Sequence, residues 1–199
     1  MIWNAKSMNK YFVPSSCILP KVEDLLDTFG GDCRLYNSCD LAQMYWQIGV
    51  DEDYSSYFAA ATPFGIYKPK AVVQGEHSAP PAAQYLSQKL ISGLTSGASL
   101  IDDIGWGGTN PHDCLDGFES LLAHLRAVSG EQAVTIRCDK LSIAAQELTF
   151  LGQHVAQGKR IANVDKIRKA VERRPTDIQD LSSFTSFASY FRAYMPLAY

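Results

Sequence analysis

Two adjacent carboxylates, Asp102 and Asp103, have the residue types and the surroundings for metal-ion chemistry. They follow the short apolar run 99–101 and precede Ile104 and the glycine-rich stretch 105–108. Two like charges this close repel each other and lose water, and a divalent cation held at the tip of a strand–turn–strand hairpin would remove that penalty. A solvated polar turn is the alternative interpretation of the pair.

A third carboxylate, Asp40, stands at the end of another strand-like run, residues 35–39. Three carboxylates on two neighbouring strand ends are able to hold two Mg²⁺ ions, which is the arrangement used for in-line transfer of a nucleotidyl group. Asp40, Asp102 and Asp103 are therefore the candidate metal ligands of this chain.

Helices and strands at predictable positions surround these carboxylates. A helix is expected to start at Pro20, with apolar residues at a period of 3.6, and to stop at Gly30–Gly31. Further helices are expected at 79–90, 111–128, 164–173 and 177–194, and strands in hairpins around Asp40 (34–50) and Asp102–Asp103, at 133–138 and at 147–156, with mixed strand and loop over 54–73. Because strands and helices alternate without βαβ regularity, the expected fold class is α+β, an antiparallel sheet with helices on one face.

Length and composition set limits on the class of protein. With 199 residues, 46% of them hydrophobic, the chain can bury a core and suits one domain or one domain plus an appendage. It has no apolar run of the roughly 18 residues that a membrane span needs, and residues 1–6 lack the apolar core of a signal peptide. An intracellular location, cytoplasmic or nuclear, with no membrane contact is therefore expected. Five cysteines without CxxC spacing argue against a zinc site or a disulfide framework.

Charge is distributed unevenly along the chain. The formal net charge of −3 counts mildly against strong nucleic-acid binding, which depends on cations that contact phosphates. One C-terminal segment, residues 159–174, is nevertheless basic and has only two acidic residues. Its cations are Lys159, Arg160, Lys166, Arg168, Lys169, Arg173 and Arg174. Two interpretations of this segment stay open, a solvated helix face and a surface for nucleic acid.

Motifs in a fixed succession surround Asp40 and continue along the chain. They are LLDTFGG at 25–31, CDLAQMYWQI at 39–48, DED at 51–53, ATPFG at 61–65, SAP at 78–80, Gln84, IDDI at 101–104, FLGQHV at 150–155, LSSF at 181–184 and ASYFR at 188–192. In this order they resemble the reverse transcriptase of gypsy-type LTR retrotransposons over roughly residues 19–194. The resemblance implies a polymerase palm plus partial fingers over 19–176, an irregular N-terminal segment over 1–18, and a C-terminal helix over 177–199 that leads toward a thumb or connection.

The resemblance also implies an activity, RNA-directed DNA polymerase, within a retrotransposon polyprotein. Its partners would be an RNA or DNA template-primer and dNTPs, with RNase H and integrase regions elsewhere in the parent polyprotein. Asp40, Asp102 and Asp103 match the metal-binding aspartates for two Mg²⁺ ions, which Mn²⁺ can replace, and the backbone carbonyl of Leu41 is a further expected ligand. The reaction would be attack of a primer 3′-hydroxyl on the α-phosphate of a dNTP.

Further positions match residues that contact the nucleotide. The backbone N–H groups of Gln43 and Met44 would face the triphosphate, and Tyr45 matches the aromatic residue under the sugar that excludes a 2′-hydroxyl. Gln74 and Gly75 match a position near the nucleotide and the template. The alternatives are that Tyr45 is a half-buried strand tyrosine and that Gln74 is an ordinary loop residue.

Two later positions match groups that act on the leaving group and on the primer. Lys140 matches a lysine that protonates pyrophosphate as a general acid, although surface lysines are common. The segment Phe150, Leu151 and Gly152 matches the hairpin that grips the primer strand. A plain β-turn with a buried phenylalanine is the alternative there.

Several departures from the family pattern fall in the active region. Leu100 stands where a tyrosine usually precedes the aspartate pair, and Ser55 stands where the related enzymes carry a cation for the triphosphate. A charge-assisted bond of that kind is worth ~1.5–3 kcal/mol. The chain is therefore also consistent with a catalytically inactive remnant that at most binds nucleic acid, or with a structural interaction module that exposes an apolar patch.

Overall fold

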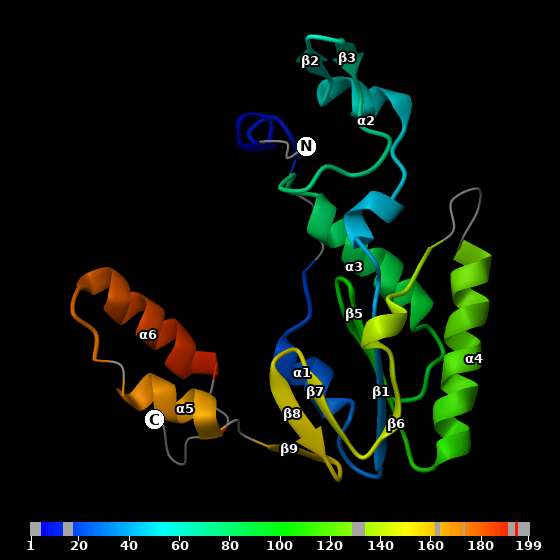
Figure 1. The fold of residues 1–199 in the computed structure, drawn as a ribbon, viewed down its shortest axis with the longest axis vertical. Helices are drawn as coiled ribbons and strands as arrows, with labels where there is room; N and C mark the ends of the chain where they lie inside the picture. Colours follow the sequence, from blue (N-terminus) through cyan, green and yellow to red (C-terminus); the bar gives the residue numbers. More distant parts are fainter. Residues whose placement is uncertain are drawn as a thin grey trace.

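A four-stranded antiparallel sheet forms the centre of the molecule (Figure 1), with the strand order β4-β5-β1-β6. The residues that the computed structural model describes are 5–13, 18–128, 134–161, 164–172, 174–190 and 194. The strands of the sheet are β1 (Leu35–Asp40), β4 (Gly97–Leu100), β5 (Asp103–Gly108) and β6 (Ser142–Ala145). The hairpin predicted around Asp102–Asp103 is confirmed as β4 and β5. The hairpin predicted over 34–50 is wrong, because β1 pairs with β5 and β6, both distant in sequence.

Two long helices, α3 (Ala79–Leu90) and α4 (Pro111–Val128), cover one face of this sheet. Both have the predicted bounds, and each carries proline near its start, where a missing backbone N–H leaves no hydrogen bond unmade. The core between helices and sheet consists of Cys39, Leu41, Met44, Ala83, Leu90, Ile104, Trp106, Leu121 and Leu125.

The opposite face of the sheet is also covered, which differs from the expectation of helices on one face only. Helix α1 (Val22–Asp27) packs there together with a three-stranded sheet of β7 (Glu147–Phe150), β8 (Gln153–Ala156) and β9 (Lys159–Ile161). Strand β5 permits this close packing, since a Cβ at Gly105 would lie 2.8 Å from the ring of Phe29. The sheet is therefore the middle layer of three.

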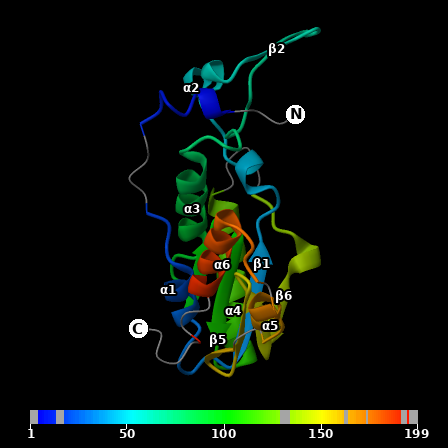
Figure 2. The ribbon, with the colours of Figure 1, turned by 90° about the vertical axis from the view of Figure 1, so that its left-hand side faces the viewer.

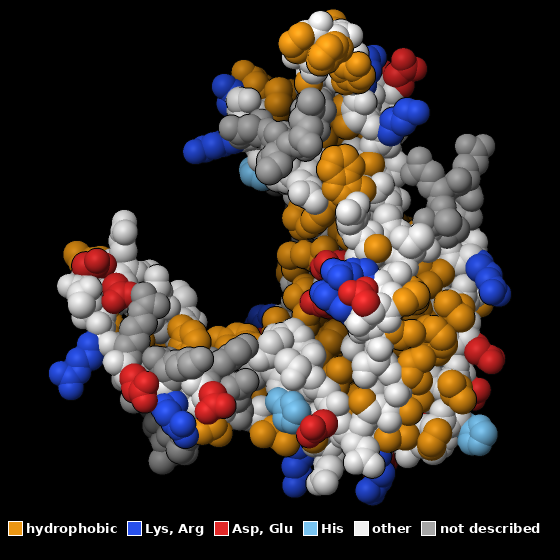
Figure 3. Space-filling view, in the orientation of Figure 1, with side chains coloured by type: hydrophobic (Ala, Val, Ile, Leu, Met, Phe, Trp, Pro, Cys, Tyr) orange, Lys and Arg blue, Asp and Glu red, His pale blue; other side chains and the backbone are white. Residues whose placement is uncertain are grey.

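A smaller unit extends from the α3 end of the molecule (Figures 1 and 2). It contains η1 (Ala5–Ser7), α2 (Glu52–Tyr57), β2 (Ala60–Thr62) and β3 (Gly65–Tyr67). The helix α2 lies where strand and loop were predicted, and it begins where the Asp51 carboxylate accepts a hydrogen bond of 2.7 Å from Tyr54 N–H. The N-terminal segment packs on this unit through Phe12, whose ring stacks on Phe58 at 5.5 Å. Hydrophobic side chains gather at the β2–β3 tip (Figure 3), where Phe64 is 89% exposed.

Helices α5 (Val164–Glu172) and α6 (Ile178–Tyr190) stand apart from the central sheet and leave the molecule hollowed between them and the α2 unit (Figures 1 and 3). One attachment is the hydroxyl of Tyr190, which donates to the carbonyl oxygen of Leu151 at 2.8 Å. The domain bounds 1–18, 19–176 and 177–199 stay predictions, and parts of the first and last segments lie outside the described residues. None of the helices in the described part has the length and apolar character needed to cross a bilayer.

Candidate active site

Two of the three predicted metal ligands face each other across neighbouring strands. Asp40 is the last residue of β1, Asp103 is the first residue of β5, and the two are direct partners in the antiparallel register. Directly opposite residues in an antiparallel pair have their Cβ atoms about 4.5–5.5 Å apart. The ladder continues by one bond, since Leu41 N–H donates to the carbonyl oxygen of Asp102 at 2.8 Å. The sheet therefore brings together carboxylates that are far apart in sequence.

The electrostatics of this pair show an unbalanced negative charge. Burial first, and then the negative charges of Asp102 and Asp40, together raise the pKa of the Asp103 carboxyl from 3.8 to about 6. A hydrogen bond between the Asp103 and Asp40 carboxyl groups, which needs one proton, acts in that direction too. At neutral pH these groups repel one another unless a cation lies between them.

Lys140 supplies one cation to this cluster. It lies at the end of η3 (Cys138–Lys140), and its Nζ donates a hydrogen bond to Oδ2 of Asp40 in an ion pair. Backbone bonds hold the two segments together, because Arg137 N–H donates to the carbonyl oxygen of Asp40 at 2.8 Å. The bond to Asp40 raises the pKa of Lys140, so the ammonium form is favoured. The predicted proton donor thus contacts a predicted metal ligand, and its role as a general acid stays a prediction.

The donor chemistry of the cluster fits a divalent cation, because carboxylate oxygens are the hard ligands that Mg²⁺ prefers. In this structure, however, Asp40 and Asp103 form a pair across the two strands, and Asp102 is a neighbour of this pair rather than a third grouped ligand. Asp40 is engaged by Lys140, and the Asp102 side chain is exposed. Across residues 5–13, 18–128, 134–161 and the described C-terminal residues, no three His, Cys, Asp or Glu side chains form a group able to hold a metal ion.

The segment after Asp40 turns sharply into a short helix beside the aspartates. Gln43 is exposed and has a left-handed backbone (φ 47°), and it caps η2 (Met44–Gln47). The side chains of Leu41 and Met44 are buried in the core, so any contact of these two residues with a ligand would come from their backbone atoms. Tyr45 is half-buried, and its pKa is raised first by burial and then by the charge of Asp102. Its hydroxyl therefore lies within electrostatic reach of the aspartates, and it is a helical residue rather than a strand tyrosine.

Gln74 and Gly75 form an exposed turn that precedes α3. Gly75 has a φ of +89°, a conformation that favours glycine. Asn9 holds the turn, since its Nδ2 donates to the Gly75 carbonyl oxygen at 2.8 Å and its Oδ1 accepts from His77 N–H at 3.1 Å. No sequence pattern pointed to Asn9, because its two partners, Gly75 and His77, lie 66 and 68 positions further along the chain. Contact of Gln74 and Gly75 with a nucleotide stays a prediction.

The predicted primer-binding segment is the tight turn between β7 and β8. Leu151 (φ 50°) and Gly152 (φ 77°) both have positive φ, as a two-residue hairpin turn of type I′ requires. Phe150 is buried, and its ring meets that of Phe29 edge-on at 5.3 Å. Phe150 therefore anchors the hairpin on the sheet, as the β-turn alternative expected, and contact of this turn with a primer stays a prediction.

Ser55, which stands where the related enzymes carry a cation, lies within helix α2. The residue is buried at 7% exposure, and its Oγ donates to the carbonyl oxygen of Glu52 within α2. Leu100 is confirmed as a strand residue at the end of β4, where it pairs with Asp103.

Two buried carboxamides beside the site carried no recognised role in the sequence. Asn37 is fully buried on β1, donates to the Trp106 carbonyl oxygen at 3.1 Å and accepts from Ala144 N–H at 2.8 Å. It therefore bridges β5 and β6. Gln84 is fully buried on α3 and contacts the strand that leads to the aspartate pair. An amide side chain among mostly uncharged neighbours was the sequence signal that could have pointed to Asn37 and Gln84.

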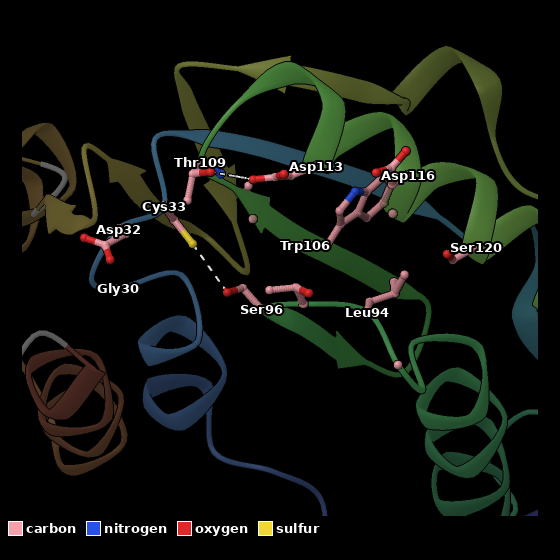
Figure 4. A pocket seen from close by; sticks show the side chains of 15 residues that line it. Gly30, Asp32, Cys33, Leu94, Ser96, Trp106, Thr109, Asp113, Asp116 and Ser120 are labelled. Carbon is pink, nitrogen blue, oxygen red and sulfur yellow. Dashed lines mark hydrogen bonds between the residues drawn. The ribbon is translucent and has the colours of Figure 1, made fainter.

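A cavity of about 590 Å³ lies at the other end of β5 (Figure 4). It lies between the segment after α1, the loop after α3 and the first turns of α4, and its lining includes Cys33, Ser96, Trp106, Asp113 and Asp116. None of the predicted site residues lines it. The candidate site thus lies at the opposite end of β5 from this cavity.

The fold is that of known retroviral Pol proteins. A foamy viral protease-reverse transcriptase in complex with double-stranded DNA superposes with a TM-score of 0.86 and 18% identity, over 99% of this chain and 34% of that chain. The same viral protein in complex with an RNA/DNA hybrid gives a TM-score of 0.77 and 17% identity, over 95% and 25% of the two chains.

Sequence relatives point to the same class. An uncharacterized protein of Caenorhabditis elegans is 28% identical over 179 residues, 89% of this chain and 14% of that protein. The retrovirus-related Pol polyprotein from transposon 297 of Drosophila melanogaster is 24% identical over 194 residues, 96% of this chain and 18% of that protein. The chain thus spans less than a fifth of either relative. No family model matches it. The chain is similar to one region of retrotransposon and retroviral polyproteins.

Proposed function

We propose that this chain is the reverse transcriptase region, palm plus partial fingers, of a gypsy-type LTR retrotransposon polyprotein. The reaction is RNA-directed DNA synthesis, in which a primer 3′-hydroxyl attacks the α-phosphate of a dNTP. The observation that carries the proposal is the pairing of Asp40 with Asp103 at one end of the central sheet, with Asp102 adjacent and Lys140 in contact. The sequence motifs and the shared fold support it from two independent directions.

The carboxylates of Asp40, Asp102 and Asp103, with the backbone carbonyl of Leu41, would hold two Mg²⁺ ions, or Mn²⁺ in their place. Bound metal lowers the pKa of the attacking hydroxyl and neutralises charge on the leaving pyrophosphate. Asp40 would hold the metal with the carboxylate that Lys140 contacts in this structure. The ammonium group of Lys140 would give its proton to the leaving pyrophosphate.

The remaining residues bind and orient the substrates. The backbone N–H groups of Gln43 and Met44 face the triphosphate, and Tyr45 lies under the sugar beside Asp102. Gln74 and Gly75 contact the nucleotide or the template base, and the turn Phe150–Gly152 contacts the primer. A nucleic-acid duplex as partner is supported by the foamy viral structures, which hold double-stranded DNA or an RNA/DNA hybrid.

A catalytically inactive remnant is the second candidate, and specific observations favour it. No three potential ligands are grouped for a metal within the described residues, and Asp40 is engaged by Lys140. Leu100 offers no hydroxyl for a primer. A third candidate is an interaction module, for which the exposed Phe64 and Ile66 at the β2–β3 tip supply apolar surface. Dye binding and light scattering of the tip variant Phe64→Ser/Ile66→Ser test that candidate.

Primer extension decides between polymerase and remnant. The purified chain is given poly(rA)/oligo(dT), dTTP and either Mg²⁺ or Mn²⁺, and Asp102→Asn/Asp103→Asn serves as the blank. Extension that disappears in the blank supports the polymerase. Protein that is folded by circular dichroism, yet extends nothing at millimolar dTTP with either metal, favours the remnant.

A further inference from the structure

A single buried carboxamide joins helix α3 to the turn that carries the aspartate pair. Gln84 lies in the middle of α3 and is fully buried. Its Nε2 donates to the carbonyl oxygen of Ser99 at 3.0 Å, and its Oε1 accepts from the backbone N–H of Ile101 at 2.9 Å. Because a carbonyl only accepts and an N–H only donates, these two partners also fix which way the amide points.

The turn needs such support because its backbone is strained. Ile101 has a φ of +56°, in the left-handed region that β-branched residues rarely adopt. It is the residue directly before Asp102, and β5 begins at Asp103. A conformation of this kind persists only when its surroundings hold it in place. The described hydrogen bond to the Ile101 N–H comes from Gln84.

The side chain of glutamine is suited to this position in two respects. It carries a donor and an acceptor on one planar group, so one side chain satisfies two backbone groups on either side of Leu100. It is also neutral, which matters in a fully buried place next to the turn that carries two carboxylates. Glutamate would lose the donor and bury a further negative charge, and methionine would fill the space with neither hydrogen bond.

We infer that Gln84 is a positioning residue, which sets the backbone geometry of the turn at 101–103 and thereby the placement of the Asp102 and Asp103 carboxylates relative to Asp40. It acts through the backbone and touches no substrate. The inference rests on the proposed function only for its catalytic consequence, since the two hydrogen bonds from Gln84 to residues 99 and 101 are a property of the folded chain itself.

The test compares Gln84→Met with Ser87→Ala, a matched control one turn further along α3. Ser87 is also fully buried, and its Oγ donates to the Gln84 carbonyl oxygen at 3.0 Å, so its loss removes a buried hydrogen bond of the helix without touching the turn. Three measurements are made on each variant: amide hydrogen exchange and chemical shifts at residues 101–103 without metal, Mn²⁺ binding by water-proton relaxation, and primer extension.

The expected result is selective. Gln84→Met loses the protection of the Ile101 amide and shifts the amides of Asp102 and Asp103, while α4 residues keep their spectra. Groups that orient metal ligands typically contribute about 10–100-fold to metal affinity or activity, so Mn²⁺ binding and extension should both fall about tenfold or more. Ser87→Ala should change both less than about threefold. Gln84→Glu should restore the Ile101 bond in part and give an intermediate exchange rate.

Each other outcome overturns either this inference or the proposed function, and the two are separable. If the spectra of residues 101–103 in folded Gln84→Met match those of Ser87→Ala, Gln84 does not position the turn. If those spectra change while Mn²⁺ binding and extension stay at the wild-type level, the turn is positioned but its placement does not matter for the site, which also overturns the inference. If the wild-type chain binds no Mn²⁺ and extends nothing, the proposed function fails, and the spectra alone decide the role of Gln84.

Discussion

The substitution Asp103→Asn should stabilise the metal-free protein at neutral pH. The pKa of Asp103 is raised from 3.8 to about 6 by burial and by the charges of Asp102 and Asp40. The folded state therefore binds this proton more tightly than the unfolded state does. The stability that protonated Asp103 contributes is fully present below about pH 4 and is lost as the pH rises from about 4 to 6. Asparagine keeps the donor toward Asp40 and removes the charge.

The size of the effect follows from the same pKa. A rise from 3.8 to about 6 corresponds to roughly 3 kcal/mol as an upper bound. Asp103 is only half-buried, and solvent screening reduces this to about 1 kcal/mol. For a chain of this length, 1 kcal/mol shifts the melting temperature by about 2–4 °C.

The assay is thermal unfolding of wild type and Asp103→Asn in chelator at pH 4, 5, 6 and 7, with the exposed Asp116→Asn on α4 as control. The difference between variant and wild type should be near zero at pH 4 and grow to its full value by pH 7. Addition of Mg²⁺ at ten times its dissociation constant should stabilise wild type by about 1.4 kcal/mol and the variant by much less. A variant that is less stable than wild type at pH 7, or a difference that does not depend on pH, would refute the reasoning.

Three further predictions concern other contacts. Ser99→Ala should leave the free energy of unfolding unchanged or raise it by about 1 kcal/mol in urea titration, because the buried Ser99 hydroxyl has no hydrogen-bond partner among the described residues; a clear loss of stability would reveal a further partner. Gly117→Ala would place a Cβ 2.6 Å from the indole of Trp106, so overpacking of about 1–3 kcal/mol should exceed the gain of about 1 kcal/mol in helix propensity, with a shift in tryptophan fluorescence; an unshifted spectrum would contradict it. Lys140→Gln should tighten Mn²⁺ binding at the freed Asp40 carboxylate while slowing extension about 100-fold. Extension at the wild-type rate in Lys140→Arg would argue against proton donation, because arginine keeps the charge but does not give up a proton.

The parts of the fold that follow from local patterns were predictable from the sequence. Helices α3 and α4 have the predicted bounds, because their apolar periodicity and the prolines near their starts are properties of a single segment. The aspartate hairpin was found for the same reason. Helix α2 was missed because its clearest signal, the Asp51 cap, is a common residue in an acidic stretch.

The parts that depend on long-range pairing were not predictable in this way. The chain after Asp40 was expected to turn back as a strand, but Gln43 adopts a left-handed backbone and directs the chain into η2. The actual partner of β1 is β5, a choice made by the whole sheet. For the site, the residue types predicted that three carboxylates are candidate metal ligands. The contact of Lys140 with Asp40 and the hydrogen bond of Gln84 to Ile101 exist only after folding.

The register between β1 and β5 has a consequence for how the site comes into being during folding. Asp40 and Asp103 are 63 positions apart (103 − 40), and they meet only after a non-local strand pair has formed, which is a slow kind of contact. A slip of one residue in that pair would turn one carboxylate to the opposite face of the sheet. A divalent cation able to bind both carboxylates would therefore recognise only chains with the correct pairing, and would act on a newly made polypeptide as a selector of the native register.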